Sequence, residues 1–287
     1  MAGVNTNRTN IQLPAEVSTE ILQKTQEASA VMQLARQISL PGRGAEIPVI
    51  VSDPVAGWVG ETEAKPVSNP SIDKKVMTAY KLAVIVPFSM EFKRDIPALY
   101  NALVSRLPNA LGKQFDATVF GNVNAPGSNF DTFASCTAQS ISGTATYSGL
   151  VAADTDVAVH GGILNGYVIS PQAKGILLGA LDDNKRPLFI NSVAEGAIPM
   201  ILGSRTLVSK GAYKAGTPNV VGFAGDWTQA VYGTVEGVQI TVSDQATLTS
   251  GATTINLFQQ NMFAVRAEIE IGFRADTTVF NKLTATA

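Results

Sequence analysis

The sequence has very few side chains of the kinds that bind metals or act as catalytic bases. Its 287 residues include one histidine and one cysteine, whereas a zinc site needs several such ligands clustered together. A Ser-His-Asp triad would have to use His160, which we interpret as a surface or capping histidine because Gly161-Gly162 follows it. Cys136 has no partner for an intrachain disulfide and is expected to be a small buried apolar residue. Enzyme activity is therefore the weaker hypothesis.

Charge is also scarce. Charged residues make up 15% of the sequence, compared with about 25% in typical soluble domains. This low fraction fits either a large buried core or a surface that partners cover. The net charge is −2, and the basic clusters Lys74-Lys75 and Lys93-Arg94 are too short to form a basic stripe. A dedicated nucleic-acid-binding surface is therefore not predicted.

Membrane, secretion and phosphate-binding signals are missing as well. The longest apolar runs, such as Leu82 to Phe88, are strand-sized and fall well short of the ~18 apolar residues of a membrane helix. The N-terminus has no signal-peptide pattern, and no glycine-rich phosphate-binding motif occurs. The acidic pair Asp182-Asp183 has no calcium-binding loop around it, so it is interpreted as a solvated turn. We therefore predict no cofactor and no metal.

The first third of the chain combines a helix with a long hairpin. Residues 1–14 are polar and are interpreted as an extended arm. Apolar residues at helical spacing predict a helix from residue 17 to 38, which Pro41-Gly42 ends. Strands are predicted over 46–51 and 75–88, with a polar segment between them. Such a hairpin is marginal alone in water, so we expect it to lie on a neighbour; the alternative is a flexible surface loop.

The remainder is predicted to be one long helix followed by short alternating elements. An apolar stripe predicts a helix over 96–119, which Pro108 is expected to kink or interrupt. Residues 123–150 are interpreted as a loop. Short helices are predicted at 154–161 and 171–181, and strands at 166–170, 201–209, 219–224, 230–233, 237–242, 261–271 and 278–283. The predicted fold class is α+β, with a separate α/β region between about 125 and 240.

Six segments carry a more specific signal through their order and spacing. They are residues 58–92 (beginning WVGETEAKPVSNPS), 111–122 (LGKQFDATVFGN), 166–189 (GYVISPQAKGILLGALDDNKRPLF), 201–209, 222–233 and 261–284. Together they resemble the major capsid proteins of tailed double-stranded DNA bacteriophages, the family with the Hong Kong 97-type fold. The resemblance spans roughly residues 15 to 285.

The resemblance implies four parts and a function. The parts are an N-arm with the first helix (1–44), an extended E-loop hairpin (45–88), a P-domain with a long spine helix (89–124 and 241–287) and an A-domain (125–240). The implied function is self-assembly, without enzyme activity, into the pentamers and hexamers of an icosahedral shell that encloses the double-stranded DNA genome. Assembly would occur in the host bacterial cytoplasm, and the product would be part of the virion.

Subunit contacts are expected at both ends of the hairpin. In this family the hairpin lies across the adjacent subunit, so we expect contacts at Trp58, Val59 and Glu61, and at Lys93 and Arg94 near the spine helix. Expected partners are copies of this chain, a separate scaffolding protein, a portal, and DNA bound without sequence specificity, with no membrane. Separate scaffolding is expected because only a short arm precedes the first helix.

Covalent crosslinking between subunits is not predicted, and three other functions are alternatives to the capsid. Some family members join a Lys of one subunit to an Asn of another, but Ser243 to Thr254 contains neither Asn nor Glu. We therefore predict no autocatalytic crosslinking. The alternatives are an encapsulin-type nanocompartment shell that binds cargo proteins, an α/β hydrolase that uses His160, and a monomeric binding module.

Overall fold

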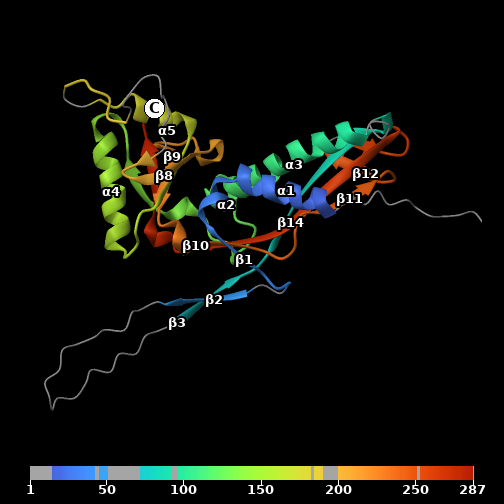
Figure 1. Cartoon of the computed structure of the whole chain (residues 1–287), viewed down its shortest axis with the longest axis horizontal. Coiled ribbons are helices and arrows are strands. Elements are labelled where there is room, and N and C mark those ends of the chain that lie inside the picture. The colour runs from blue at the N-terminus through green and yellow to red at the C-terminus, as the bar shows by residue number, and fades with distance from the viewer. Residues whose placement is uncertain are drawn as a thin grey trace, which may run out of the picture.

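The computed structural model describes residues 15–42, 45–50, 72–91, 96–181, 184–189, 200–250 and 253–286. The helices are α1 (Ala15–Ala28), α2 (Ala30–Leu34), α3 (Ile96–Val119), α4 (Thr146–Val159) and α5 (Pro171–Leu178). The strands are β1 (Arg36–Ser39), β2 (Ala45–Ile50), β3 (Ile72–Met77), β4 (Tyr80–Ser89), β5 (Thr137–Ser140), β6 (Gly166–Ile169), β7 (Met200–Ile201), β8 (Ser204–Val208), β9 (Asn219–Gly225), β10 (Ala230–Thr234), β11 (Gln239–Ser243), β12 (Thr247–Ser250), β13 (Thr253–Asn256), β14 (Met262–Ala275) and β15 (Phe280–Ala285). Figure 1 shows a compact lobe beside an elongated lobe, from whose base the β2–β3 hairpin projects.

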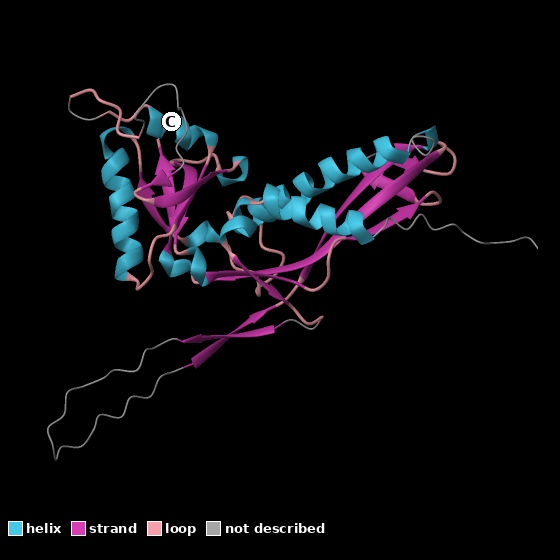
Figure 2. Ribbon diagram, viewed as in Figure 1, coloured by secondary structure: helices cyan, strands magenta, loops and turns pink. Residues whose placement is uncertain are grey.

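The elongated lobe is built on a five-stranded sheet around β14. The strand order is β1-β10-β14-β11, and β4 also pairs with β14. Along the middle of β14 the side chains of Val265, Ala267 and Ile269 are buried, whereas Arg266, Glu268 and Glu270 between and after them are partly or fully exposed, which is the period-two pattern of a half-buried strand. The buried face packs on Leu107 and Leu111 of α3. Figure 2 shows β14 running from this lobe toward the other one.

Helix α3 continues through Pro108 without interruption. Proline removes one backbone hydrogen bond from a helix, but Pro108 is itself buried next to Leu107. Packing of the apolar stripe against β14 therefore outweighs the lost bond. Of the two effects predicted for Pro108, the interruption is wrong and the kink stays a prediction.

The predicted helix over 17–38 is also divided. It ends at Ala28, and the Ser29 hydroxyl accepts a hydrogen bond from the Met32 amide to begin the short helix α2. Residues 36–39 then leave the helical path and pair in parallel with β10. The apolar spacing of Ala35 and Ile38 fits either structure, and pairing with a distant strand decides between them.

The compact lobe contains a six-stranded sheet with helices on it. The strand order is β5-β15-β9-β6-β8-β7; α4 packs on β5, β9 and β15, and α5 packs on β6 and β9. The core is aromatic: Phe133 stacks on Phe280 with a centroid distance of 4.4 Å, and Phe120 stacks on Phe223 at 4.8 Å. The buried Trp227 indole donates to the Gly166 carbonyl at 3.0 Å.

Two further predictions are corrected, and one hairpin was missed. The interval 123–150 contains strand β5 and the start of α4 at Thr146, not only a loop. The strand predicted over 75–88 is two strands, β3 and β4, separated at Thr78-Ala79. Hairpin β12–β13 was not predicted. No helix within the described ranges combines the length and the apolar character needed to cross a membrane.

Candidate functional site

The five expected subunit contacts, Trp58, Val59, Glu61, Lys93 and Arg94, lie outside the described residues and stay predictions. The turn at Asp182-Asp183 lies outside them too. What the structure does describe is the root of the hairpin, where β2 and β3 meet the sheets.

Arg274 of β14 ties this root to the body of the protein. Its Nε donates to the Val76 carbonyl at 2.8 Å, its Nη1 to Asp131 Oδ1 at 2.8 Å and its Nη2 to Asn129 Oδ1 at 2.9 Å. One planar guanidinium thus joins β3, β14 and the segment after α3. Lysine has no comparable fork of donors.

Other contacts around Arg274 tighten the same joint. Asp131 Oδ2 accepts from the Ala275 amide at 3.1 Å, and Asn129 Nδ2 donates to the Thr78 hydroxyl at 3.1 Å. The Lys75 ammonium donates to the Ala275 carbonyl at 3.2 Å, while Met77 is fully buried. The hairpin therefore leaves the body from a fixed base.

A second joint holds α1 and α2 on the long helix. Asp116 of α3 is almost completely buried, and its carboxylate accepts from the Ser29 hydroxyl at 2.5 Å, from the Ala30 amide at 2.9 Å and from the Val31 amide at 3.3 Å. The carboxylate thus satisfies amides at the N-terminus of α2, which otherwise lack partners in a helix. Ser209 Oγ lies 3.5 Å from Asp116 Oδ2 and extends the joint toward β8.

Burial sets the protonation behaviour of this carboxyl group. Removal from water raises the pKa of Asp116 from 3.8 to about 6, although the hydrogen bonds from Ser29, Ala30, Val31 and Ser209 act to lower it. An adjoining cavity of about 500 Å³ is also lined by Glu27, Lys113 and Lys210. Hydrogen bonds account for both carboxylate oxygens, so we interpret Asp116 as a structural joint.

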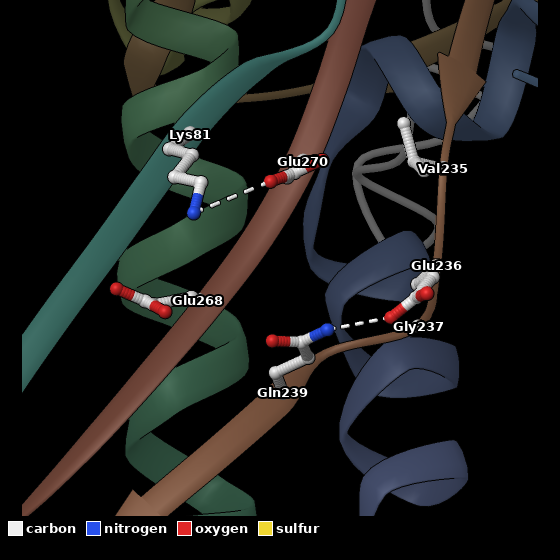
Figure 3. A pocket seen from close by; sticks show the side chains of 7 residues that line it. All are labelled: Lys81, Val235, Glu236, Gly237, Gln239, Glu268 and Glu270. Atoms are coloured by element: carbon white, nitrogen blue, oxygen red, sulfur yellow. Dashed lines mark hydrogen bonds and ion pairs between the residues drawn. The ribbon is translucent and has the colours of Figure 1, made fainter. Parts of the chain in front are cut away.

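The polar face of the five-stranded sheet carries a small hollow (Figure 3). Its volume is about 120 Å³, and it is lined by Lys81, Val235, Glu236, Gly237, Gln239, Glu268 and Glu270. Lys81 Nζ lies 3.4 Å from Glu270 Oε1, and Gln239 Nε2 donates to Glu236 Oε2 at 2.5 Å. Within the described part of the chain, no group of three or more His, Cys, Asp and Glu is arranged to hold a metal ion.

His160 and Cys136, the single histidine and the single cysteine of the sequence, both have structural surroundings. His160 caps the end of α4, with Nδ1 2.8 Å from the Asp156 carbonyl oxygen. Cys136 is buried, and removal from water raises the pKa of its thiol to about 12, so it stays a neutral thiol at physiological pH. The predictions of a capping histidine and a buried cysteine are confirmed.

Sequence reasoning missed the residues of both joints. Asp116 had a usable signal, because it adjoins Phe115 on the buried stripe of a helix and a carboxylate there requires partners. The joint at Arg274 had no such signal. Arg274 lies about 145 residues from Asn129 and Asp131 in the sequence, and only the order of the strands brings the three side chains together.

Comparison with known proteins gives independent information about the family of this chain. The sequence matches the phage capsid family over residues 10–277. Two similar proteins, each named probable major capsid protein gp17, come from Mycobacterium phage D29 and Mycobacterium phage L5; each is 31% identical and covers 95% of this chain and 89% of its own length. The fold is similar to a solved structure from Gordonia phage Cozz, with a TM-score of 0.73 and 21% identity over 90% of this chain and 87% of that one.

Proposed function

This chain belongs to the phage capsid family and has the Hong Kong 97-type fold, and from that premise we propose how its parts build a shell. It is a major capsid protein of tailed phages, a component of the virion whose copies form an icosahedral capsid. The observation that carries this conclusion is the 31% identity to two major capsid proteins over 95% of the chain.

We propose that the shell is held together by many individually weak contacts between subunits, arranged with closed symmetry. Each copy meets several neighbours, and closure of the shell makes every contact depend on the others, so weak interfaces add up to a stable particle. The joints at Arg274 and Asp116 support this mechanism because they fix the hairpin and the N-terminal helices relative to the body. Fixed parts lose less conformational entropy when they bind.

Strand pairing supports revised boundaries for the four proposed parts. Strand β4 pairs with β14 along its whole length, so we propose that the E-loop ends near Thr78 and that β4 belongs with the P-domain. Strand β15 pairs with β9 and β5, so we propose that residues 280–285 belong with the A-domain. The N-arm and the spine helix α3 are proposed as before.

The remaining partners follow from charge and from the family. We propose that the shell encloses double-stranded DNA without sequence-specific binding, because a net charge of −2 gives little phosphate attraction to oppose packaging. A separate scaffolding protein and a portal would guide assembly in the host cytoplasm. Pentamers and hexamers are the proposed capsomers. We propose that they are held together without covalent crosslinks, and that the chain assembles without acting as an enzyme.

Sedimentation velocity of the purified full chain tests the proposal. Copies of a capsid protein are expected to form a fast-sedimenting population far larger than a subunit. Nuclease treatment of particles purified from infected cells is expected to leave protected DNA of uniform length. Particles that hold a cargo protein and no DNA would favour the encapsulin-type reading, and a monomer under all conditions would contradict both shells.

A denaturing gel of mature particles tests the absence of crosslinks. We expect one band at the subunit mass. A ladder of covalent multimers would show that a Lys of one subunit had reacted with a side chain outside the Ser243 to Thr254 segment.

A further inference from the structure

Helix α4 carries apolar side chains on both of its faces. One face packs on the sheet through Leu150, Ala153 and Val157, which are fully buried. The opposite face presents Tyr147 and Val159, with 52% and 77% of their surfaces exposed. The outer face thus combines these apolar side chains with the exposed polar residues Ser148, Asp154 and Thr155. Helix α4 lies on the outer flank of the compact lobe (Figure 1), so its outer face lacks a covering element within the described chain.

Exposed apolar residues cluster on this side of the helix. Tyr147, Val151 and Val159 are spaced at multiples of four residues, with the exposed Thr155 between the two valines. Ile163, which is 79% exposed, follows the end of the helix. Single exposed apolar residues are common on protein surfaces, but a cluster of them marks an interaction site.

The opposite edge of the same sheet has a second apolar patch. Strand β5, next to α4, is one edge of the six-stranded sheet, and β7 is the other. The β7–β8 hairpin exposes Met200, Leu202 and Val208. The α4 surface and the β7–β8 hairpin are thus two different patches of one lobe, as a head-to-tail contact between copies requires.

The charges on the two surfaces are complementary. Helix α4 contains Asp154 and Asp156 and no Lys or Arg, and the β7–β8 hairpin contains Arg205 and no Asp or Glu. Asp154 on α4 and Arg205 on β8 are both exposed. Complementary charge favours pairing of the two surfaces and disfavours pairing of two α4 helices, because that would bring like charges together.

We propose that the outer face of α4 in one copy docks on the β7–β8 edge of a second copy. This contact is heterologous, and its repetition closes a ring when the rotation between successive copies divides a full turn. Tyr147, Val151 and Val159 would supply the apolar centre, and Asp154 would face Arg205 of the next copy. The inference rests on the proposed capsid function and names the surfaces through which the A-domains of neighbouring copies meet.

Charge reversal tests the pairing. Asp154→Lys and Arg205→Glu are each expected to raise the protein concentration needed for half-maximal assembly by about tenfold, the change that corresponds to ~1.4 kcal/mol of contact energy. The double variant is expected to recover assembly, because the attraction is restored with its direction inverted. Val159→Ser is expected to weaken assembly similarly, whereas Phe258→Ser, an equally exposed residue of the other lobe, serves as the matched control.

Several outcomes decide the inference. All four positions are exposed, so unassembled variants are expected to keep the wild-type circular dichroism spectrum and melting temperature. Normal assembly by both single charge variants and by Val159→Ser would overturn the contact while leaving the capsid function intact. Failure of the double variant to assemble better than either single variant would overturn the Asp154 and Arg205 pairing. A wild-type chain that never assembles would overturn the capsid function and the inference with it.

Discussion

Arg274 and Asp131 form an ion pair with an N–O distance of 2.8 Å, in which 12% and 21% of the two side chains are exposed. The pair is more enclosed than the Arg266–Glu268 pair on the polar face of the sheet, where 46% and 23% are exposed. The same guanidinium reaches the Val76 carbonyl at the hairpin root. The direction in which the hairpin leaves the body therefore depends on this side chain.

Replacement of Arg274 by lysine tests that dependence. Lysine keeps the charge but not the fork of donors, so we expect the free energy of unfolding to fall by about 2 to 3 kcal/mol. Hydrogen exchange of the amides from Val76 to Thr78 is expected to become faster than in the wild type. Urea titration and exchange mass spectrometry on unassembled subunits measure the two effects.

Arg266→Lys is the matched control, because its partner Glu268 lies on an open face. Exposed ion pairs contribute about 0 to 1 kcal/mol, so this variant is expected to unfold as the wild type does. Equal effects of the two substitutions would contradict the anchoring role of Arg274.

The buried Asp116 predicts a specific pH dependence. Its pKa is about 6 in the folded chain and 3.8 as the ordinary value, so between these values the folded state binds more protons than the unfolded state. The stability due to protonated Asp116 is fully present below pH 3.8 and is lost as pH rises through 6, by about 3 kcal/mol in total.

Asp116→Asn isolates this contribution because asparagine does not titrate. The difference in unfolding free energy, wild type minus variant, is expected to decrease between pH 4 and pH 7, since all other groups titrate alike in both proteins. Urea titrations at several pH values provide the measurement. A difference that stays constant with pH would mean that Asp116 remains ionised throughout.

Close packing of α4 on β5 depends on Gly149. A Cβ atom at this position would collide with the Ser140 carbonyl oxygen, and backbone atoms in a sheet cannot move aside easily. Gly149→Ala is therefore expected to lower the melting temperature by several degrees, in line with a loss of about 1 to 3 kcal/mol. Calorimetry of the unassembled subunit measures the change.

Gly175 of α5 provides the comparison, because nothing lies within 4 Å of a Cβ placed there. Alanine in a helix interior is favoured over glycine by roughly 0.5 to 1 kcal/mol. Gly175→Ala is thus expected to stabilise the chain. Destabilisation by Gly175→Ala equal to that by Gly149→Ala would refute the argument from close approach.

The sequence predicts those elements whose pattern is local. The alternation along β14 and the apolar stripe of α3 are repeated many times, so both elements were predicted near their observed places. Ser29 and Thr78 interrupt predicted elements for reasons that lie elsewhere in the chain. Asp116 meets Ser29 across 87 residues, and Thr78 bonds to Asn129.

The interaction surfaces were harder to predict than the fold. Helix α4 has little polar periodicity, because Tyr147 and Val159 on its outer face are as apolar as Leu150 on its inner face, so its start at Thr146 was missed. The exposed apolar side chains that obscured the helical pattern are also the reason to infer a partner for α4. Strand β15 belongs to the six-stranded sheet through pairing with β9, which no local pattern encodes.

Electron microscopy of the purified 287-residue chain shows directly whether it assembles into a capsid. We expect closed shells of uniform diameter in which ring-shaped capsomers are visible, because complementary surfaces of each copy close into rings and the rings close into a particle. A field of separate subunits at every protein concentration, pH and salt concentration tried would contradict this expectation.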